Sequence, residues 1–347
     1  MAANTTETST RYPARARQAP AAQAAAAQAP ADRALMAARP RADLPVAGTK
    51  PPRSASAAEV VQAYLRLQVA ALRSQEPRIR ADELDAVHQM RVATRRLRAA
   101  FRSFGTVIPR PETEPVMAEL RWLGTALGEA RDNEVLSGHL QASLRPVPVE
   151  LLIGPVSARV QGHYAPRRAA AHSALIEALG SPRYAALLAS LDRLAQDPPP
   201  GPQAADPARD VLPAAVRRAY RQARWRMRKA RHAPPGPDRD LALHRARKSA
   251  RRARYAAEAA RPAIGKRARR FARQMRKVQS VLGDHQDSVL ARQAARNLGI
   301  AAHLAGENAF TYGLLQESER HRADRIQARA RHVWRRASRS RYRRWMR

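Results

Sequence analysis

Apolar residues recur at helical spacing from about residue 56 to the C-terminus, and alternating runs of β-branched residues are nearly absent. Apolar positions three to four residues apart are typical of amphipathic α-helices, whereas half-buried strands alternate with a period of two. The predicted helices span approximately 57–75, 82–105, 112–145, 150–195 (interrupted at 180–182), 208–232, 239–261, 265–298 and 304–338. The pattern therefore predicts an all-α protein made of two groups of four helices.

Residues 1–55 differ from this helical region in composition, because they are rich in Ala, Pro, Gln and Arg and contain few large apolar residues. Such a segment buries too little apolar surface to offset chain entropy, and we expect it to be disordered. The expected organisation is a basic tail (1–55), a helical domain (56–340) and a basic C-terminal end (341–347). Within the domain, the first repeat spans 56–196, a Pro- and Gly-rich linker 197–207 and the second repeat 208–340.

A motif rich in His and Arg occurs once in each repeat. The segment VHQMRVATRRLR begins at Val87, and LHRARKSARRAR begins 156 residues later at Leu243. Both contain the pattern H-x-x-R-x-x-x-R-R-x-R. The pairs Leu127-Gly128 and Leu282-Gly283 match at an offset of 155. A register that slips by only one residue between these segments indicates an internal duplication.

The motif places its cations on one side of a helix, because each residue advances about 100° around the axis. In the first copy the basic stripe comprises His88, Arg91, Arg95, Arg98 and Arg102, and the opposite, core-facing side comprises Val87, Met90, Leu97, Phe101 and Phe104. In the second copy the stripe comprises His244, Arg247, Arg251 and Arg254, and the core side comprises Leu243, Ala246, Ala250, Ala253 and Ala257. Like charges four residues apart destabilise a helix. Two aligned rows therefore indicate a bound polyanion, with a solvated arginine face as the alternative.

The charge balance points to the same class of partner. Lys and Arg total 64 against 29 Asp and Glu, a formal net charge of +35 over 347 residues, which attracts polyanions. Only five of these bases are lysine, and the planar guanidinium group of arginine can hold two oxygens of one phosphate. Cysteine is absent, which excludes disulfides and thiolate sites. No apolar run approaches the roughly 20 residues of a membrane span, and no secretory signal is evident, so we expect a soluble cytoplasmic protein without a membrane partner.

Signals for catalysis or cofactors are weak. The chain has no phosphate-binding Gly-rich motif, and no Glu is followed three residues later by His as in di-iron bundles. Asp85 and His88 form a lone pair at this spacing. We interpret Asp132 and Asp287 as acids that orient guanidinium groups, rather than as ligands of Mg²⁺ for phosphoryl transfer. We therefore expect no catalytic residues, no cofactor and no bound metal.

The doubled motif and the paired segments LGEARDNEV and LGDHQDSVL resemble the CHAD family, the conserved histidine α-helical domain, over roughly 56–340. The resemblance implies two pseudo-symmetric antiparallel four-helix bundles around a basic central pore or groove. It also implies binding of inorganic polyphosphate and association with polyphosphate granules. The expected polyphosphate-binding residues are His88, Arg91, Arg95, Arg96, Arg98, Arg102, Arg121, His244, Arg247, Lys248, Arg251, Arg252, Arg254 and Arg276. The second segment has His285-Gln286 where the first has Ala130-Arg131, so a role for arginine there is restricted to the first copy.

The main alternative is a nucleic-acid-binding protein that contacts DNA or RNA through basic tails. The charge favours it, as does a C-terminus in which arginines alternate with Trp334, Tyr342 and Trp345. Proteins that bind single strands place stacking aromatic residues among their bases. In the first motif Phe101 and Phe104 lie on the core side, which favours a ligand of phosphates without bases. We expect both histidines to be neutral in the empty site, because neighbouring positive charge disfavours their protonation.

Overall fold

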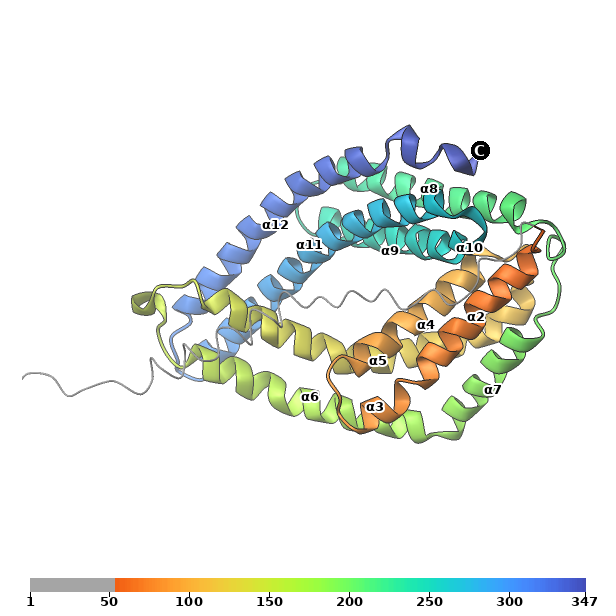
Figure 1. The fold of residues 1–347 in the computed structure, drawn as a ribbon. Helices are drawn as coiled ribbons and strands as arrows, with labels where there is room; N and C mark the ends of the chain where they lie inside the picture. The colour runs from red at the N-terminus through yellow and green to blue at the C-terminus, as the bar shows by residue number, and fades with distance from the viewer. Residues whose placement is uncertain (1–53) are drawn as a thin grey trace, which may run out of the picture. The chain divides into compact units, whose positions relative to one another are not determined.

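The computed structural model describes residues 54–347, in which every regular element is helical and only an isolated bridge joins Ser56 to Pro207. The all-α prediction is confirmed for this range, whereas the predicted disordered tail lies almost entirely outside the described residues. The long helices are α2 (Ala57–Arg73), α4 (Ala86–Ser103), α5 (Arg110–Leu144), α6 (Val156–Gly180), α7 (Pro182–Gln196), α8 (Ala208–His232), α9 (Pro237–Ala259), α11 (Lys266–Leu304) and α12 (Phe310–Ala337) (Figure 1). The shorter elements are α3 (Glu76–Arg80), α10 (Arg261–Ile264) and the 3₁₀ turns η1 (Val149–Leu151), η2 (Ser340–Tyr342) and η3 (Arg344–Met346).

The predicted breaks between helices are largely where the sequence places them. Helix α6 ends at Gly180, and Ser181 caps α7 by accepting a hydrogen bond from the Tyr184 backbone N–H at 3.2 Å. The predicted end of the third helix of the second repeat, at 298, is wrong. Helix α11 continues through Gly299 to Leu304, because the glycine that adopts the left-handed backbone conformation is Gly306, with a φ of +73°.

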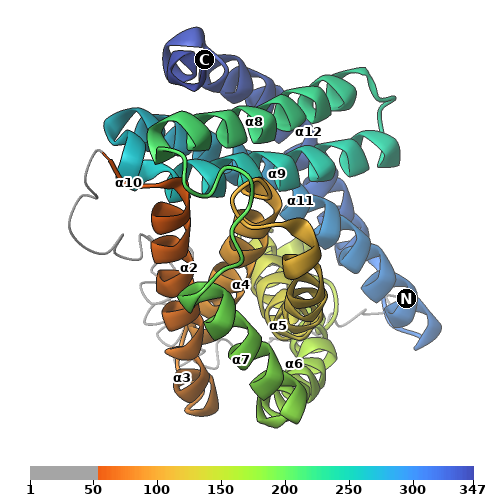
Figure 2. The same ribbon diagram turned by 90° about the vertical axis from the view of Figure 1, so that its right-hand side faces the viewer.

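The two motif helices meet where the two repeats cross. Helices α4 and α9, which carry the first and second motif, pack against each other, and α2 also contacts α8 and α9. Figure 2 shows α8 and α9 running across the ends of α2 and α4. The stripes of the two motifs are thereby brought to one interface, although they are 156 residues apart in the sequence.

The apolar faces predicted for the motif helices form part of the core. Met90, Leu97, Phe101 and Phe104 of α4 are at most 3% exposed, and Val87 packs partly buried against them. On α9, Leu243, Ala246, Ala250, Ala253 and Ala257 are buried in the same cluster. This cluster contains residues of both repeats. The alanine face of α9 lets α8 and α11 pack closely against it.

A second apolar cluster joins the far ends of the two repeats. Leu140 of α5 and Val160 of α6 are fully buried there together with Ala291 of α11 and Leu315 of α12. Beside it, the buried carboxylate of Glu319 accepts hydrogen bonds from His139 at 2.9 Å and Ser143 at 2.7 Å. These contacts join α5 to α12 across the repeats.

The C-terminal residues pack on the helices. Turn η3 contacts α8, turn η2 contacts α11, and Met346 is 3% exposed. Trp334 stacks on Tyr220 at 6.1 Å between ring centroids, and Trp345 meets Phe271 edge to face at 6.3 Å. Both indole rings therefore pack on other aromatic residues of the helices.

Candidate anion-binding site

Four guanidinium groups from the two motif copies interact electrostatically where α4 and α9 cross. We call them the central arginine group: Arg91, Arg95, Arg247 and Arg251. The charges of Arg91 and Arg247 act on both Arg95 and Arg251. Each copy of the motif therefore contributes two positions, as the duplicated sequence predicts.

Arg95 and Arg251 carry positive charge with little compensation. Burial and the charge of Arg95 lower the pKa of Arg251 to about 9, and burial also lowers the pKa of Arg95. Among residues 54–347 neither side chain forms a hydrogen bond or an ion pair, and Nε of Arg95 is buried without a partner. Buried charges in proteins are normally paired. Two unpaired guanidinium groups side by side are therefore suited to a bound anion.

The glycine of each Leu-Gly pair leaves space for the guanidinium group of the first arginine of the motif. A Cβ atom added to Gly283 would lie 3.4 Å from Nε of Arg247, and one added to Gly128 would lie 3.9 Å from the guanidinium carbon of Arg91. Arg91 also donates to a carboxylate oxygen of Asp132 at 2.6 Å. This contact fits the predicted role of Asp132 as an acid that orients arginine. Asp287, its counterpart, is half-buried on α11.

Both motif histidines lie half-buried at the edge of the central arginine group. Burial, opposed by the charge of Asp85 and assisted by the charges of Arg95, Arg131 and Arg91, lowers the pKa of His88 to about 4. Burial and the charge of Lys248 also lower the pKa of His244. Both pKa values are lowered, and this direction supports the expectation that the imidazoles are neutral. The larger cause is burial, however, and not the neighbouring positive charge that the sequence suggests.

The position that differs between the two Leu-Gly segments affects the pKa of the histidine in both copies. Arg131 of α5 acts on His88 through its charge, whereas Gln286 of α11, at the matching position, forms a hydrogen bond with His244. The sequence shows this difference but does not reveal that it bears on the histidine.

Further predicted cations continue from the central arginine group along α4 and α9. Arg98 lies near Lys248, Arg102 and Arg121, since their charges act on one another. Arg252 of α9 lies near Arg102 and near Arg226 of α8. Arg226 was not predicted, because it lies outside the duplicated motif. Arg276, the remaining predicted residue, is half-buried on α11.

Two predicted ligands are instead held in a buried ion-pair cluster. Arg254 is 7% exposed and donates to Glu258 at 2.6 Å and to Gln279 at 3.2 Å. Arg96, which is 6% exposed, donates to the other oxygen of Glu258 at 3.2 Å. The prediction that Arg254 projects away from the core is therefore wrong. Glu258 joins the two repeats, because Arg96 belongs to the first and Arg254 to the second.

Two differences between the copies explain why Arg254 is buried whereas its counterpart in the first copy, Arg98, is not. The residue one turn after Arg98 is Arg102, whereas the residue one turn after Arg254 is Glu258. The helix facing Arg98 offers Gly124 at the position where the helix facing Arg254 offers Gln279. Arg254 therefore finds an acid and an amide and becomes buried, while Arg98 faces another cation and stays half-exposed.

Tyr255 lies within the same cluster, with the guanidinium groups of Arg254 and Arg96 over its ring at 5.2 and 5.7 Å. Burial raises the pKa of its phenol, but the charges of Arg95, Arg254, Arg251 and Arg96 outweigh burial and hold that pKa below its ordinary value. The charges of the paired arginines (Arg96 and Arg254) and of the unpaired ones (Arg95 and Arg251) therefore all act on this phenol.

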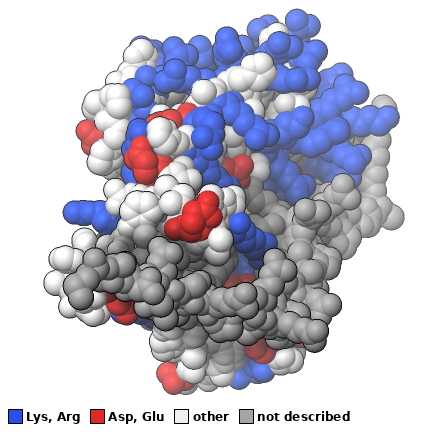
Figure 3. Space-filling view, turned by 90° about the vertical axis from the view of Figure 1, so that its left-hand side faces the viewer, with Lys and Arg blue, Asp and Glu red and all other residues white. Residues whose placement is uncertain are grey.

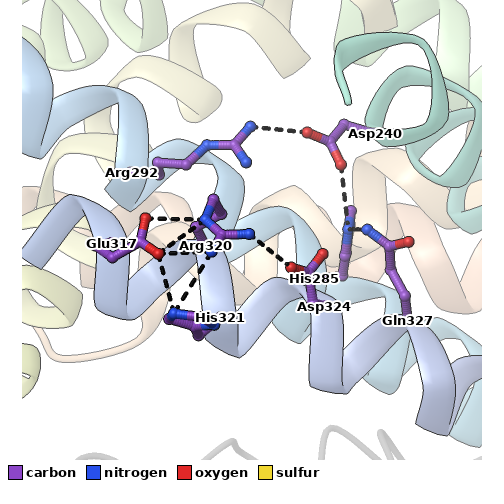
Figure 4. A network of polar contacts seen from close by, with 8 residues as sticks. All are labelled: Asp240, His285, Arg292, Glu317, Arg320, His321, Asp324 and Gln327. Carbon is purple, nitrogen blue, oxygen red and sulfur yellow. Dashed lines mark hydrogen bonds and ion pairs between the residues drawn. The ribbon is translucent and has the colours of Figure 1, made fainter. Parts of the chain in front are cut away.

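A polar network fixes the start of α9 against α11 and α12 (Figure 4). Asp240 accepts a hydrogen bond from Arg292 at 2.8 Å and lies 3.3 Å from Nε2 of His285, which is 1% exposed. Gln327 of α12 reaches the same histidine nitrogen at 3.3 Å. Burial raises the pKa of Asp240, but its contacts with His285 and Arg292 lower it below its ordinary value. His285 thus has a packing role that Ala130 of the first copy lacks.

No group of three or more His, Cys, Asp or Glu side chains within residues 54–347 is arranged to hold a metal ion. No helix in this range is both long and apolar enough to cross a membrane.

The fold and the site define an all-helical protein with a duplicated His and Arg motif at the contact between its repeats. The family model of the CHAD domain matches residues 63–296, and the chain belongs to the CHAD family. A solved structure of the CHAD domain from the plant Ricinus communis is 28% identical, with a TM-score of 0.60, and covers 82% of this chain and 95% of that one. PptA from Streptomyces chartreusis shares the fold at 22% identity and a TM-score of 0.66, covering 81% of this chain and 100% of that one.

Two curated relatives come from Mycobacterium tuberculosis: the uncharacterized protein MT2285 of strain CDC 1551 and the uncharacterized protein Rv2226 of strain H37Rv. Each is 37% identical over 282 residues, which cover 80% of this chain and 52% of the relative. The chain therefore spans about half the length of these relatives.

Proposed function

We propose that this protein binds inorganic polyphosphate at the crossing of α4 and α9, in a basic pore or groove between two four-helix bundles. The observation that carries the proposal is the pair Arg95 and Arg251, which are unpaired among the described residues although burial lowers the pKa of both. A chain of phosphates provides closely spaced negative charges without bases. Membership of the CHAD family and the flanking cations Arg98, Lys248 and Arg252 support the same ligand.

We propose binding without catalysis. The carboxylates nearest the central arginine group already hold guanidinium groups, since Asp132 pairs with Arg91 and Glu258 with Arg96 and Arg254. Such pairing leaves no free carboxylate pair for a metal-assisted step at these positions. We also propose that the protein resides in the cytoplasm at polyphosphate granules, where this ligand is found.

Competition between long-chain polyphosphate and duplex DNA for the full chain tests the proposal. We expect polyphosphate to displace DNA at equal phosphate concentration over a salt series. The preference arises because the half-buried cations are screened by salt less than exposed ones. Fluorescence anisotropy of labelled DNA reports the displacement. Stronger retention of DNA at every salt concentration would favour the nucleic-acid alternative.

The lowered pKa values of the motif histidines predict that affinity depends on pH. Both imidazoles are neutral in the empty site at pH 7, and bound phosphate raises their pKa because it adds negative charge. The complex then takes up protons, so affinity for polyphosphate rises severalfold as the pH falls from 8 to 6. Titration calorimetry at each pH measures this change.

Replacing both histidines, as His88→Gln with His244→Gln, is expected to remove this rise. His303→Gln provides the control, since His303 is exposed at the end of α11. An unchanged pH dependence in the double variant would assign the effect to the ligand or to other groups.

A further inference from the structure

A second cluster of cations lies on α8, away from the duplicated motif. A pocket of about 170 Å³ is lined by Arg224, Arg228, Arg231, His232 and Trp334. The four basic residues follow one face of α8 at helical spacing and are exposed, and Trp334 of α12 is 7% exposed. No acidic side chain of residues 54–347 lines the pocket. Lys and Arg side chains cover much of the upper part of the face drawn in Figure 3, on the level where α8 and α12 lie in Figure 1.

The matching positions of the first repeat carry no cations. The residues of the first repeat that match Arg224 and Arg228 are Gln68 and Leu72, which are 1% and 0% exposed. They are buried because α7 packs against α2. In the second repeat the same helix face is open and carries guanidinium groups instead.

The floor of the pocket is aromatic and fixed in place. Trp334 stacks on Tyr220, with an angle of 19° between the rings, and the guanidinium group of Arg343 lies 6.0 Å above Tyr220. None of Arg224, Arg228 and Arg231 forms a hydrogen bond or an ion pair within the described part of the chain. Three unpaired guanidinium groups over a rigid floor form a small site for a multiply charged oxyanion.

We propose that this pocket between α8 and α12 binds a small phosphoanion of the size of pyrophosphate, independently of the central arginine group. Its volume suits one or two phosphate groups rather than an extended chain. Arginine forks suit phosphate oxygens, and the indole of Trp334 excludes water from one side. The protein would then hold a short phosphoanion at one site and a polyphosphate chain at another.

The indole N–H signal of Trp334 in a two-dimensional ¹H–¹⁵N spectrum tests the proposal, with Trp334→Phe to assign it. The titration uses full-length protein carrying Arg95→Gln and Arg251→Gln, which removes the unpaired pair of the central site. Inorganic pyrophosphate is expected to shift the signal. Adding Arg224→Gln and Arg228→Gln should weaken this response about tenfold or more, the effect of losing a charge-assisted hydrogen bond.

The matched control is Arg267→Gln with Arg270→Gln, which removes the same charge from exposed positions of α11 that do not line the pocket. It should leave the response intact. An unmoved Trp334 signal, or equal weakening in both double variants, would overturn the pocket.

A parallel titration with long-chain polyphosphate distinguishes a short phosphoanion from a long chain as the ligand of the pocket. If only the long chain moves the Trp334 signal, and only while Arg95 and Arg251 are intact, the pocket is not an independent site. Because the main titration is done without those two arginines, failure of the proposed polyphosphate function leaves this result unaffected.

Discussion

Replacing Arg95 and Arg251 together by glutamine is expected to weaken polyphosphate binding by about a hundredfold or more, since two charge-assisted contacts are lost. The slope of log affinity against log salt should fall by about 1 to 2, because fewer counterions are released from the ligand. Titration calorimetry at several salt concentrations measures both quantities. The variant Arg267→Gln with Arg270→Gln, which lowers the net charge equally, should change affinity far less.

The same double variant is expected to be more stable than the wild-type protein in the absence of ligand. Burial and the charge of Arg95 lower the pKa of Arg251 to about 9, which means that the fold disfavours its charge. Removing both charges should raise the free energy of unfolding by about 0.5 to 2 kcal/mol, a range typical of stabilising substitutions at functional sites. Urea denaturation at pH 7 measures it. A loss of stability instead would assign these arginines a structural role.

Replacing Glu258 by alanine should have the opposite effect on the fold. The change leaves Arg96 and Arg254 buried without their carboxylate, and breaking a buried ion pair typically costs about 3 to 5 kcal/mol. Urea denaturation gives the change in the free energy of unfolding. The control is Glu119→Ala, whose partner Arg183 is 52% exposed, and for an exposed pair the loss stays below about 1 kcal/mol.

A further variant separates lost pairing from lost packing. If Arg96 and Arg254 are changed to methionine together with Glu258→Ala, most of the stability should return, because apolar replacement of buried ion pairs is often neutral or favourable. Continued instability would mean that the cluster stabilises the fold chiefly through packing.

The sequence was sufficient to place most of the helices and most positions on the two faces of the motif. The spacing of apolar residues placed Met90 and Leu97 in the core and Arg95 and Arg251 on the opposite side, and the structure agrees. Helical periodicity defines directions around one axis, and it is reliable where a helix buries a single wide apolar face.

The burial of Arg96 and Arg254 could not be predicted from periodicity alone. Glu258 follows Arg254 by four residues, a spacing at which side chains of a helix meet, so that contact was visible in the sequence. The contact of Arg96 with Glu258 spans 162 residues and depends on how α4 crosses α9. The pocket on α8 was missed for a related reason, because the gap between α8 and α12 arises from helix packing and not from a motif.

The shared apolar core bears on the origin of the duplication. The largest cluster draws on both repeats, and the second cluster joins α5 and α6 to α11 and α12. An ancestral chain with one repeat would have exposed these faces, and it would have required a second copy of itself to fold, as obligate homodimers do. Fusion of two such copies would have replaced an association that depends on concentration by a covalent link. It would also have allowed each half to mutate separately, which accounts for Arg102 in one half where the other has Glu258.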